Sequence, residues 1–187
     1  MRQKYRYERD GIKFPSVTSL LPKRYVGFSK YNRHNSINRD VLGNKAEYGT
    51  DKHQLLKDAI DGDENEFTKY IPEIEEKFGK ILFREKSLFS TKYHFAGTPD
   101  IITERAIIDF KTSMTNKKYY SLQLAGYNIL TTENGILNTK KHILFTINDK
   151  GKAVFKNVYS DESSMIFKLC LQEHQNKKKF KQYLRGM

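Results

Sequence analysis

The stretch YHFAGTPDIITERAIIDFK, residues 93–111, contains two short apolar runs separated by a polar turn. The runs cover residues 93–102 and 106–110, and both are rich in aromatic and β-branched side chains, which predicts buried strands rather than helices. If residues 103–105 form a hairpin turn, strand pairing brings Asp100 close to Asp109. The stretch therefore predicts two neighbouring strands that hold two carboxylates close together.

Asp109 and Lys111 are two residues apart, so on a strand their side chains lie on one face, about 6.6 Å apart along the strand. Ile108 and Phe110 then point to the opposite face. A buried aspartate and lysine are costly unless they are paired or bound to a metal. Two readings follow: a divalent metal site for Mg²⁺ or Mn²⁺, with the Phe110 carbonyl as a further oxygen ligand, or a structural Asp109–Lys111 ion pair with a surface Asp100.

Further motifs in the sequence resemble those of a known protein family. Asp100, and Asp109 with Lys111, match the two halves of the active-site motif of the PD-(D/E)xK nuclease superfamily. The chain also contains Gln-x-x-x-Tyr at 123–127 and Gly-x-x-x-His at 49–53, in the order found in the RecB-like branch. The chain therefore resembles this branch over residues 53–127.

The resemblance implies an α/β fold with a restriction-endonuclease-like core, in which helices flank a central mixed β-sheet. It also implies metal-dependent phosphodiester hydrolysis with a water nucleophile. The implied metal ligands are His53, Asp100, Asp109 and the carbonyl of Phe110, and the implied catalytic lysine is Lys111. An imidazole ligand suits Mn²⁺ better than Mg²⁺.

Four other residues are candidates for contacting nucleic acid. The resemblance places Gln123 and Tyr127 on one helix face beside the metal. Thr112 and Ser113 follow the lysine directly, so their hydroxyls could hold a phosphate oxygen or cap a helix. Glu85 stays outside the predicted metal set, because it could equally pair with a neighbouring basic side chain at the surface.

The segment Pro15-Ser16-Val17-Thr18 narrows the resemblance. It is similar to mitochondrial genome maintenance exonucleases and their bacteriophage relatives, which implies an exonuclease acting on single-stranded DNA ends. A helix cap at Ser16 or Thr18 is the simpler alternative. Two other functions stay open: a DNA endonuclease of the same superfamily, and a non-catalytic nucleic-acid-binding module.

The formal net charge of +12 predicts a polyanionic partner. Tyrosines interleaved with the basic clusters favour single-stranded DNA, since unpaired bases stack on aromatic rings. No phosphate-binding loop of the ATPase type occurs in the sequence. We therefore expect a helicase or a single-strand-binding protein as a partner if the protein degrades long DNA.

The length of 187 residues predicts a single domain. We divide it into an N-terminal hairpin and helices (1–78), a catalytic sheet core (79–160) and a basic C-terminal helix (161–187). Helices are expected at 29–42, 46–60, 64–78 and 119–132, with a last helix capped by Asp161 or Ser163. Strands are expected at 81–83, 143–147 and 153–155, besides the two described above.

The single cysteine, Cys170, excludes an internal disulfide and a four-cysteine iron–sulfur cluster. The sequence has no apolar run long enough to cross a bilayer and no signal-peptide or transit-peptide pattern. We therefore expect no membrane association and a cytoplasmic location, in a bacterium or a phage-infected cell.

Overall fold

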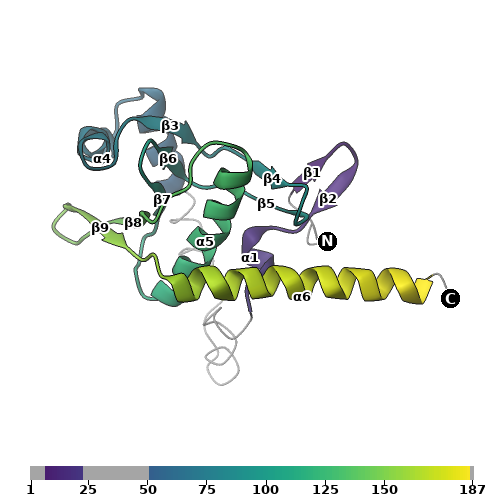
Figure 1. Ribbon diagram of the computed structural model, residues 1–187. Coiled ribbons are helices and arrows are strands. Elements are labelled where there is room, and N and C mark those ends of the chain that lie inside the picture. The colour runs from purple at the N-terminus through teal and green to yellow at the C-terminus, as the bar shows by residue number, and fades with distance from the viewer. Residues whose placement is uncertain (1–6, 23–50, 186–187) are drawn as a thin grey trace, which may run out of the picture.

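The computed structural model describes residues 7–22 and 51–185, with only the backbone given for residue 178 and residues 180–185. A five-stranded sheet forms its centre, in the order β3-β6-β7-β8-β9 (Figure 1). Its strands are β3 (Ile81–Arg84), β6 (Ile101–Thr103), β7 (Ile107–Phe110), β8 (His142–Ile147) and β9 (Ala153–Asn157). The β7–β8 pair is parallel and the other pairs are antiparallel, so the sheet is mixed. The predicted α/β class with a mixed central sheet is confirmed.

The β6–β7 hairpin forms as predicted, with Ile101 opposite Ile108 and a turn at 103–105. Thr103 stabilises this turn, because its hydroxyl accepts a hydrogen bond from the Ala106 amide at 3.0 Å and donates to the Phe78 carbonyl at 2.7 Å. The parallel β7 and β8 are joined by helix α5 (Lys117–Glu133), the usual crossover between parallel strands.

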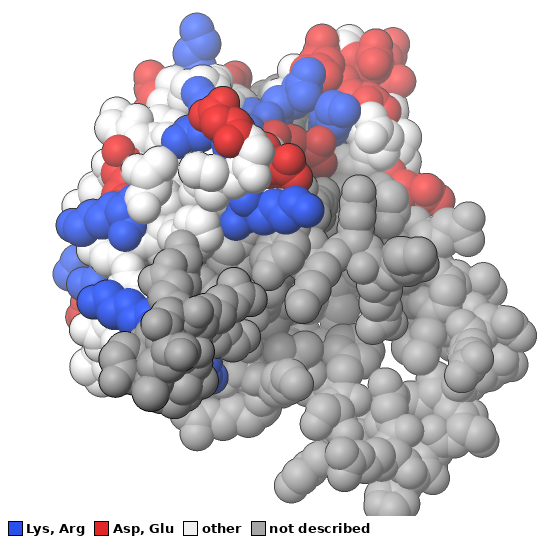
Figure 2. Space-filling view, turned by 90° about the vertical axis from the view of Figure 1, so that its right-hand side faces the viewer, with Lys and Arg blue, Asp and Glu red and all other residues white. Residues whose placement is uncertain are grey.

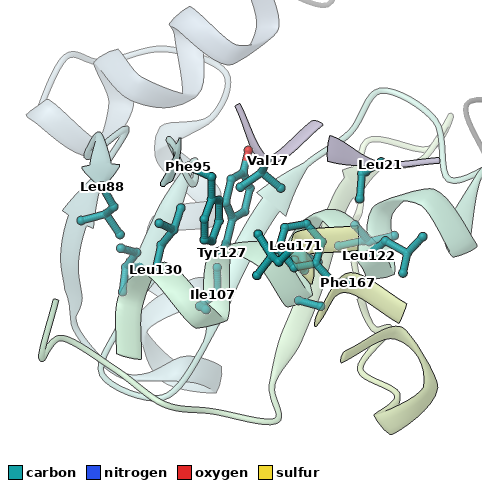
Figure 3. Packing of buried hydrophobic residues seen from close by; sticks show 14 residues of the cluster. Val17, Leu21, Leu88, Phe95, Ile107, Leu122, Tyr127, Leu130, Phe167 and Leu171 are labelled. Carbon is teal, nitrogen blue, oxygen red and sulfur yellow. The ribbon is translucent and has the colours of Figure 1, made fainter. Parts of the chain in front are cut away.

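Hydrophobic cores cover both faces of the sheet. On one face, Ile107 and Leu144 pack with α5, with α1 (Val17–Leu20) and with α6 (Asp161–Arg185) (Figure 3). On the other face, Ile108 and Phe110 pack with the helix at residues 51–61 and with α4 (Ile71–Phe78). Adjacent residues of β7 thus enter different cores, as the two-residue period of a strand requires.

Two small sheets lie beside the central one. The first pairs β1 (Tyr7–Arg9) with β2 (Ile12–Phe14). Asp10 and Gly11 form its turn with φ of 53° and 72°, the double positive φ that an Asp-Gly hairpin adopts. The second pairs β4 (Leu88–Ser90), which the sequence did not predict, with β5 (Phe95–Gly97).

The prediction of one strand over residues 93–102 was wrong. The chain leaves β5 after Gly97 and enters β6 at Ile101, and the two strands belong to different sheets. Pro99 lies in the break. Its missing N–H cannot continue a strand ladder, and this accounts for the interruption.

The predicted helix over 64–78 was also wrong in its first part. The structure has a 3₁₀ turn η2 (Thr68–Tyr70) followed by α4, and Pro72 lies in the first turn of α4. Asn65 ends the preceding turn instead of starting a helix, since its side chain binds the backbone on both sides. The predicted helix over 29–42 and the start of that over 46–60 lie outside the described residues, while 51–61 is helical as predicted.

The last helix begins at Asp161, but the cap is a different residue from those predicted. The hydroxyl of Ser160 accepts the amide of Ser163 at 3.0 Å. Cys170 is buried, as predicted. Within residues 7–22 and 51–185, no helix combines the length and the apolar character that crossing a bilayer requires.

Positive charge does not gather on the face that Figure 2 shows. Lys and Arg side chains on the described part of that face are interspersed with Asp and Glu. Three groups of basic residues, at 2–9, 23–24 and 30–39, lie wholly or mostly outside the described residues.

Candidate active site

Asp100 lies immediately before β6, where the sheet register places it next to the end of β7. Its Oδ2 accepts the backbone N–H of Phe110 at 2.7 Å. The same oxygen lies 3.4 Å from Nδ1 of His53, which comes from the helix at 51–61. Two residues far apart in the sequence are therefore brought together as the resemblance implied.

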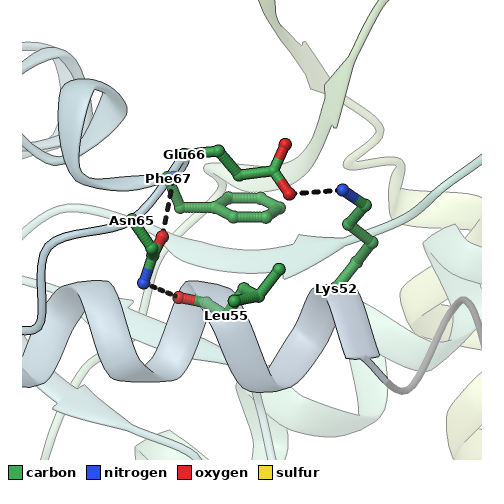
Figure 4. Close-up of polar contacts among 5 residues, drawn as sticks. All are labelled: Lys52, Leu55, Asn65, Glu66 and Phe67. Atoms are coloured by element: carbon green, nitrogen blue, oxygen red, sulfur yellow. Dashed lines mark hydrogen bonds and ion pairs between the residues drawn. The ribbon is translucent and has the colours of Figure 1, made fainter.

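Packing and hydrogen bonds behind His53 fix the position of its helix. The His53 ring lies edge-on to the Phe110 ring with centroids 5.3 Å apart, and Phe67 contacts Phe110 at the same distance. Asn65 donates to the Leu55 carbonyl at 2.9 Å and accepts the Phe67 amide at 2.8 Å (Figure 4). Figure 4 also shows the ion pair of Lys52 with Glu66.

Asp109 and Lys111 point to the same face, as predicted, and form a close ion pair. Lys111 Nζ lies 2.6 Å from Oδ2 of Asp109, whose side chain is 2% exposed. No donor among the described residues meets this oxygen at a hydrogen-bonding angle. The backbone of Lys111 is held by the sheet, where its amide donates to the Phe145 carbonyl at 2.8 Å.

The two carboxylates differ in proton affinity. Burial raises the pKa of Asp109 to about 6, with the negative charge of Asp100 adding to this effect and Lys111 opposing it. Burial acts on Asp100 in the same direction, but the hydrogen bond and charge of His53, with Lys111 and the Phe110 amide, bring its pKa below the ordinary value. Asp100 is thus ionised at neutral pH, and Asp109 titrates closer to neutrality.

The carboxylates raise the pKa of both basic groups. Burial favours the neutral form of Lys111, but the charges of Asp109 and Asp100 outweigh it and raise the Lys111 pKa. In the same way Asp100 outweighs burial and raises the pKa of His53. A role for Lys111 as a proton acceptor would need the opposite shift, so its surroundings favour a permanent positive charge.

These side chains line one cleft of about 490 Å³. Its walls come from the N-terminal hairpin, α1, the helix at 51–61, the sheet and α5. The lining residues are Tyr7, Ser16, Val17, Thr18, His53, Gln54, Glu85, Gly97, Thr98, Asp100, Asp109, Lys111, Gln123 and Tyr127.

Gln123 and Tyr127 reach the cleft from α5 and are both buried. Gln123 Nε2 donates to the Tyr127 hydroxyl at 2.9 Å. Burial, together with the charges of Asp109 and Asp100, raises the pKa of Tyr127 well above its usual value. Tyr127 therefore remains a neutral phenol at physiological pH.

Thr112 and Ser113 are exposed and are not among the residues that line the cleft. Helix α5 is capped instead by Asn116, whose side chain accepts the Tyr119 amide. The Phe110 side chain points away into the second core, as predicted.

The cleft lining also includes residues outside the predicted site set. Glu85 reaches the cleft from a backbone with φ of 41°, directly after β3, and its amide donates to the Asp100 carbonyl at 2.9 Å. Thr98 accepts the Tyr7 hydroxyl at 3.1 Å, which ties the N-terminal hairpin to the cleft. Ser16 caps α1, as its simpler reading predicted, and also lines the cleft. The Pro-Ser-Val-Thr segment was the sequence signal for this wall.

The cleft suits a divalent metal in its donor set. In the part of the chain that the structure describes, no three His, Cys, Asp or Glu side chains are already gathered as a metal cluster. However, His53, Asp100 and Asp109 line one cleft, and the buried Asp109 Oδ2 is balanced by the charge of Lys111 at 2.6 Å without hydrogen-bonding geometry. Imidazole nitrogen and carboxylate oxygen are ligands that Mn²⁺ and Mg²⁺ accept.

No protein-family model matches this sequence. No curated protein is significantly similar to it either. Function is therefore inferred from the residues of the cleft.

Proposed function

We propose that this protein is a metal-dependent deoxyribonuclease with a restriction-endonuclease-like fold, and that it degrades single-stranded DNA from an end. The observation that carries the proposal is the cleft in which His53, Asp100, Asp109 and Lys111 converge from separate elements. The mixed sheet, with the two carboxylates on its central hairpin, supports the fold assignment.

The side chains of His53, Asp100 and Asp109 would hold Mg²⁺ or Mn²⁺, with the Phe110 carbonyl as a further ligand. A bound divalent ion supplies Lewis-acid polarisation of the phosphoryl oxygens and activation of water. His53 must be neutral to bind a cation, so the raised pKa that Asp100 gives it means that metal and proton compete for this imidazole.

Lys111 supplies a fixed positive charge beside the reacting phosphate. Its raised pKa keeps it protonated, which favours stabilisation of the developing charge on phosphorus-bound oxygens over acceptance of a proton. The Tyr127 phenol and the Gln123 amide offer neutral hydrogen-bonding groups on the wall of the cleft that α5 forms. Glu85 is a further acceptor for positioning water.

A cleavage assay tests this proposal. Linear single-stranded DNA labelled at the 5′ or 3′ end, and a circular single strand, are incubated with Mg²⁺, Mn²⁺ or EDTA. We expect metal-dependent shortening of the linear strands only. Lys111→Ala should lower the rate by about 10²–10³-fold, whereas Lys152→Ala, at an exposed lysine of the β8–β9 turn, should leave it unchanged.

The Lys111→Ala variant leaves Asp109 without its counter-ion. The fold of this variant is therefore checked by circular dichroism and by retention of DNA binding. Cutting of the circle would identify an endonuclease. Binding of all three DNAs without cleavage under either metal would overturn the catalytic proposal and favour a binding module.

A further inference from the structure

A second hollow, of about 260 Å³, lies where α5 begins, beside β9 and the start of α6. We call it the lysine hollow. Its lining residues are Lys117, Lys118, Ser121, Leu122, Lys156, Asn157, Val158, Ser160, Glu162, Ser163 and Ile166. Leu122, Val158 and Ile166 provide apolar walls, and three lysines stand against a single carboxylate.

Two of these lysines approach each other closely. Lys117 comes from the first turn of α5 and Lys156 from β9, and their proximity lowers the pKa of Lys156 through a hydrogen bond and charge repulsion. Neither forms an ion pair with a carboxylate within the described ranges. An anion placed between two exposed cations that lie this close reduces the repulsion between them.

The hydroxyls in the hollow are already satisfied by one another. Ser121 Oγ donates to the Val158 carbonyl at 2.5 Å and lies 2.7 Å from Ser163 Oγ. Ser160 is 2.8 Å from the same Ser163 hydroxyl. The charges of Lys117 and Lys156, unlike the hydroxyls, are therefore not balanced by a partner within the described ranges.

The sheet register relates this hollow to the active-site cleft. Asp109 on β7 is paired with Leu144 on β8, and Leu144 is paired with Lys156 on β9. Cross-strand partners point to the same face, so these three side chains form one row on the α5 side of the sheet. Two strand spacings separate the ends of the row, about 10 Å.

We propose that the lysine hollow binds a phosphate of the same DNA strand whose scissile bond lies in the cleft, with Lys117 and Lys156 as its ligands. This inference rests on the proposed function. The apolar walls would receive the adjoining sugar or base, and Lys118 would add to the local positive potential. The site is a binding subsite and takes no part in the chemistry.

The test measures binding of a fluorescent oligothymidylate by anisotropy in EDTA, so that no strand is cleaved. The double variant Lys117→Gln/Lys156→Gln is compared with Lys150→Gln/Lys152→Gln in the β8–β9 turn. Both remove two exposed lysines and change the net charge equally, so a general charge effect would appear in both.

We expect the first variant to bind about fivefold more weakly at low salt. Its salt-dependence slope should be smaller by about 0.7, because one phosphate is no longer neutralised by the protein. The control variant should keep the wild-type slope. In the cleavage assay the first variant should raise KM for the oligonucleotide and leave kcat unchanged.

The outcomes separate the two proposals. Equal slopes for both variants, with DNA cleavage intact in the wild type, would overturn the lysine hollow and leave the nuclease proposal standing. A reduced slope for the first variant in a protein that never cleaves DNA would support the phosphate site and overturn the nuclease. Failure of the wild-type protein to bind the oligonucleotide in EDTA would overturn the phosphate site, while the cleavage assay with Mg²⁺ or Mn²⁺ alone decides the nuclease proposal.

Discussion

Asp109 is the residue on which the site depends most directly. Its position two residues before Lys111 predicted a shared face, and the ion pair at 2.6 Å confirms that arrangement. Its proton affinity could not be predicted from the sequence. It arises from burial beneath α5 and from Asp100 on the neighbouring strand, and both depend on tertiary packing. Likewise, the sequence left the charge of Lys111 open, while the folded site favours the protonated form.

Substitution of this residue tests the metal site independently of catalysis. In the wild type, Mn²⁺ at a hundred times its Kd should stabilise the native state by about 2.7 kcal/mol and raise Tm by several degrees. Asp109→Asn removes an anionic ligand and should abolish most of that increase. Asp149→Asn, at an exposed turn, should retain it. The measurement is differential scanning fluorimetry across a Mn²⁺ titration, and equal increases in all three proteins would refute the assignment.

At the scale of elements, local patterns predicted the β6–β7 hairpin, β8, β9, α5 and an N-terminal hairpin. They did not predict β4, because Leu88–Ser90 is too short to show a two-residue period and forms a strand only through pairing with β5. They also extended a helix across Asn65, whose bonds to Leu55 and Phe67 are formed only after the chain has turned. The cleft lining was partly missed for the same reason: Glu85 and Thr98 lie in connections between strands.

The hydrogen bonds of Asn65 to the Leu55 carbonyl and the Phe67 amide should control how well His53 is positioned. Asn65→Ala leaves the Leu55 carbonyl and the Phe67 amide without these partners, at a cost of about 1–3 kcal/mol. The helix at 51–61 is then held less firmly, and Mn²⁺ should bind several-fold more weakly. Asn138→Ala, which removes an exposed amide contact to Asn128, should bind Mn²⁺ like the wild type.

The comparison with His53→Ala distinguishes positioning from general destabilisation. If Asn65 acts through the histidine, the double variant Asn65→Ala/His53→Ala should bind Mn²⁺ no more weakly than His53→Ala alone. Additive losses in isothermal titration calorimetry would show that Asn65 acts elsewhere.

For the whole molecule, stability towards acid should depend on a histidine far from the cleft. His142 starts β8, is 1% exposed, and contacts the Thr139 carbonyl through Nε2 at 3.1 Å. Burial lowers its pKa to about 4, against 6.5 for the free side chain. Between pH 6.5 and 4 the unfolded chain therefore binds more protons at this position than the native state. Its contribution to stability is present above pH 6.5 and is lost as the pH falls through that window.

The expected loss at this position is about 3 kcal/mol in the free energy of unfolding between pH 7 and pH 4. The His142→Gln variant has no imidazole to protonate. Between pH 7 and pH 4 its free energy of unfolding should therefore fall by about 3 kcal/mol less than that of the wild type. The raised pKa of Asp109 acts in the opposite direction, but it is common to both proteins and cancels in the difference. Urea unfolding at several pH values measures this, and parallel pH profiles would show that His142 has no such role.

The close packing around two glycines has a consequence for biosynthesis. A Cβ at Gly97 would lie 2.8 Å from both Val17 and Tyr127, and one at Gly126 would lie 2.6 Å from Phe167. The N-terminal wall of the cleft is thus supported by residues made much later, including one from the last helix. During translation residues 7–22 can dock first on β4 and β5, but their contacts with α5 and α6 form only after those helices have left the ribosome. A nascent chain of this protein therefore cannot present a finished cleft until Phe167 has left the ribosome.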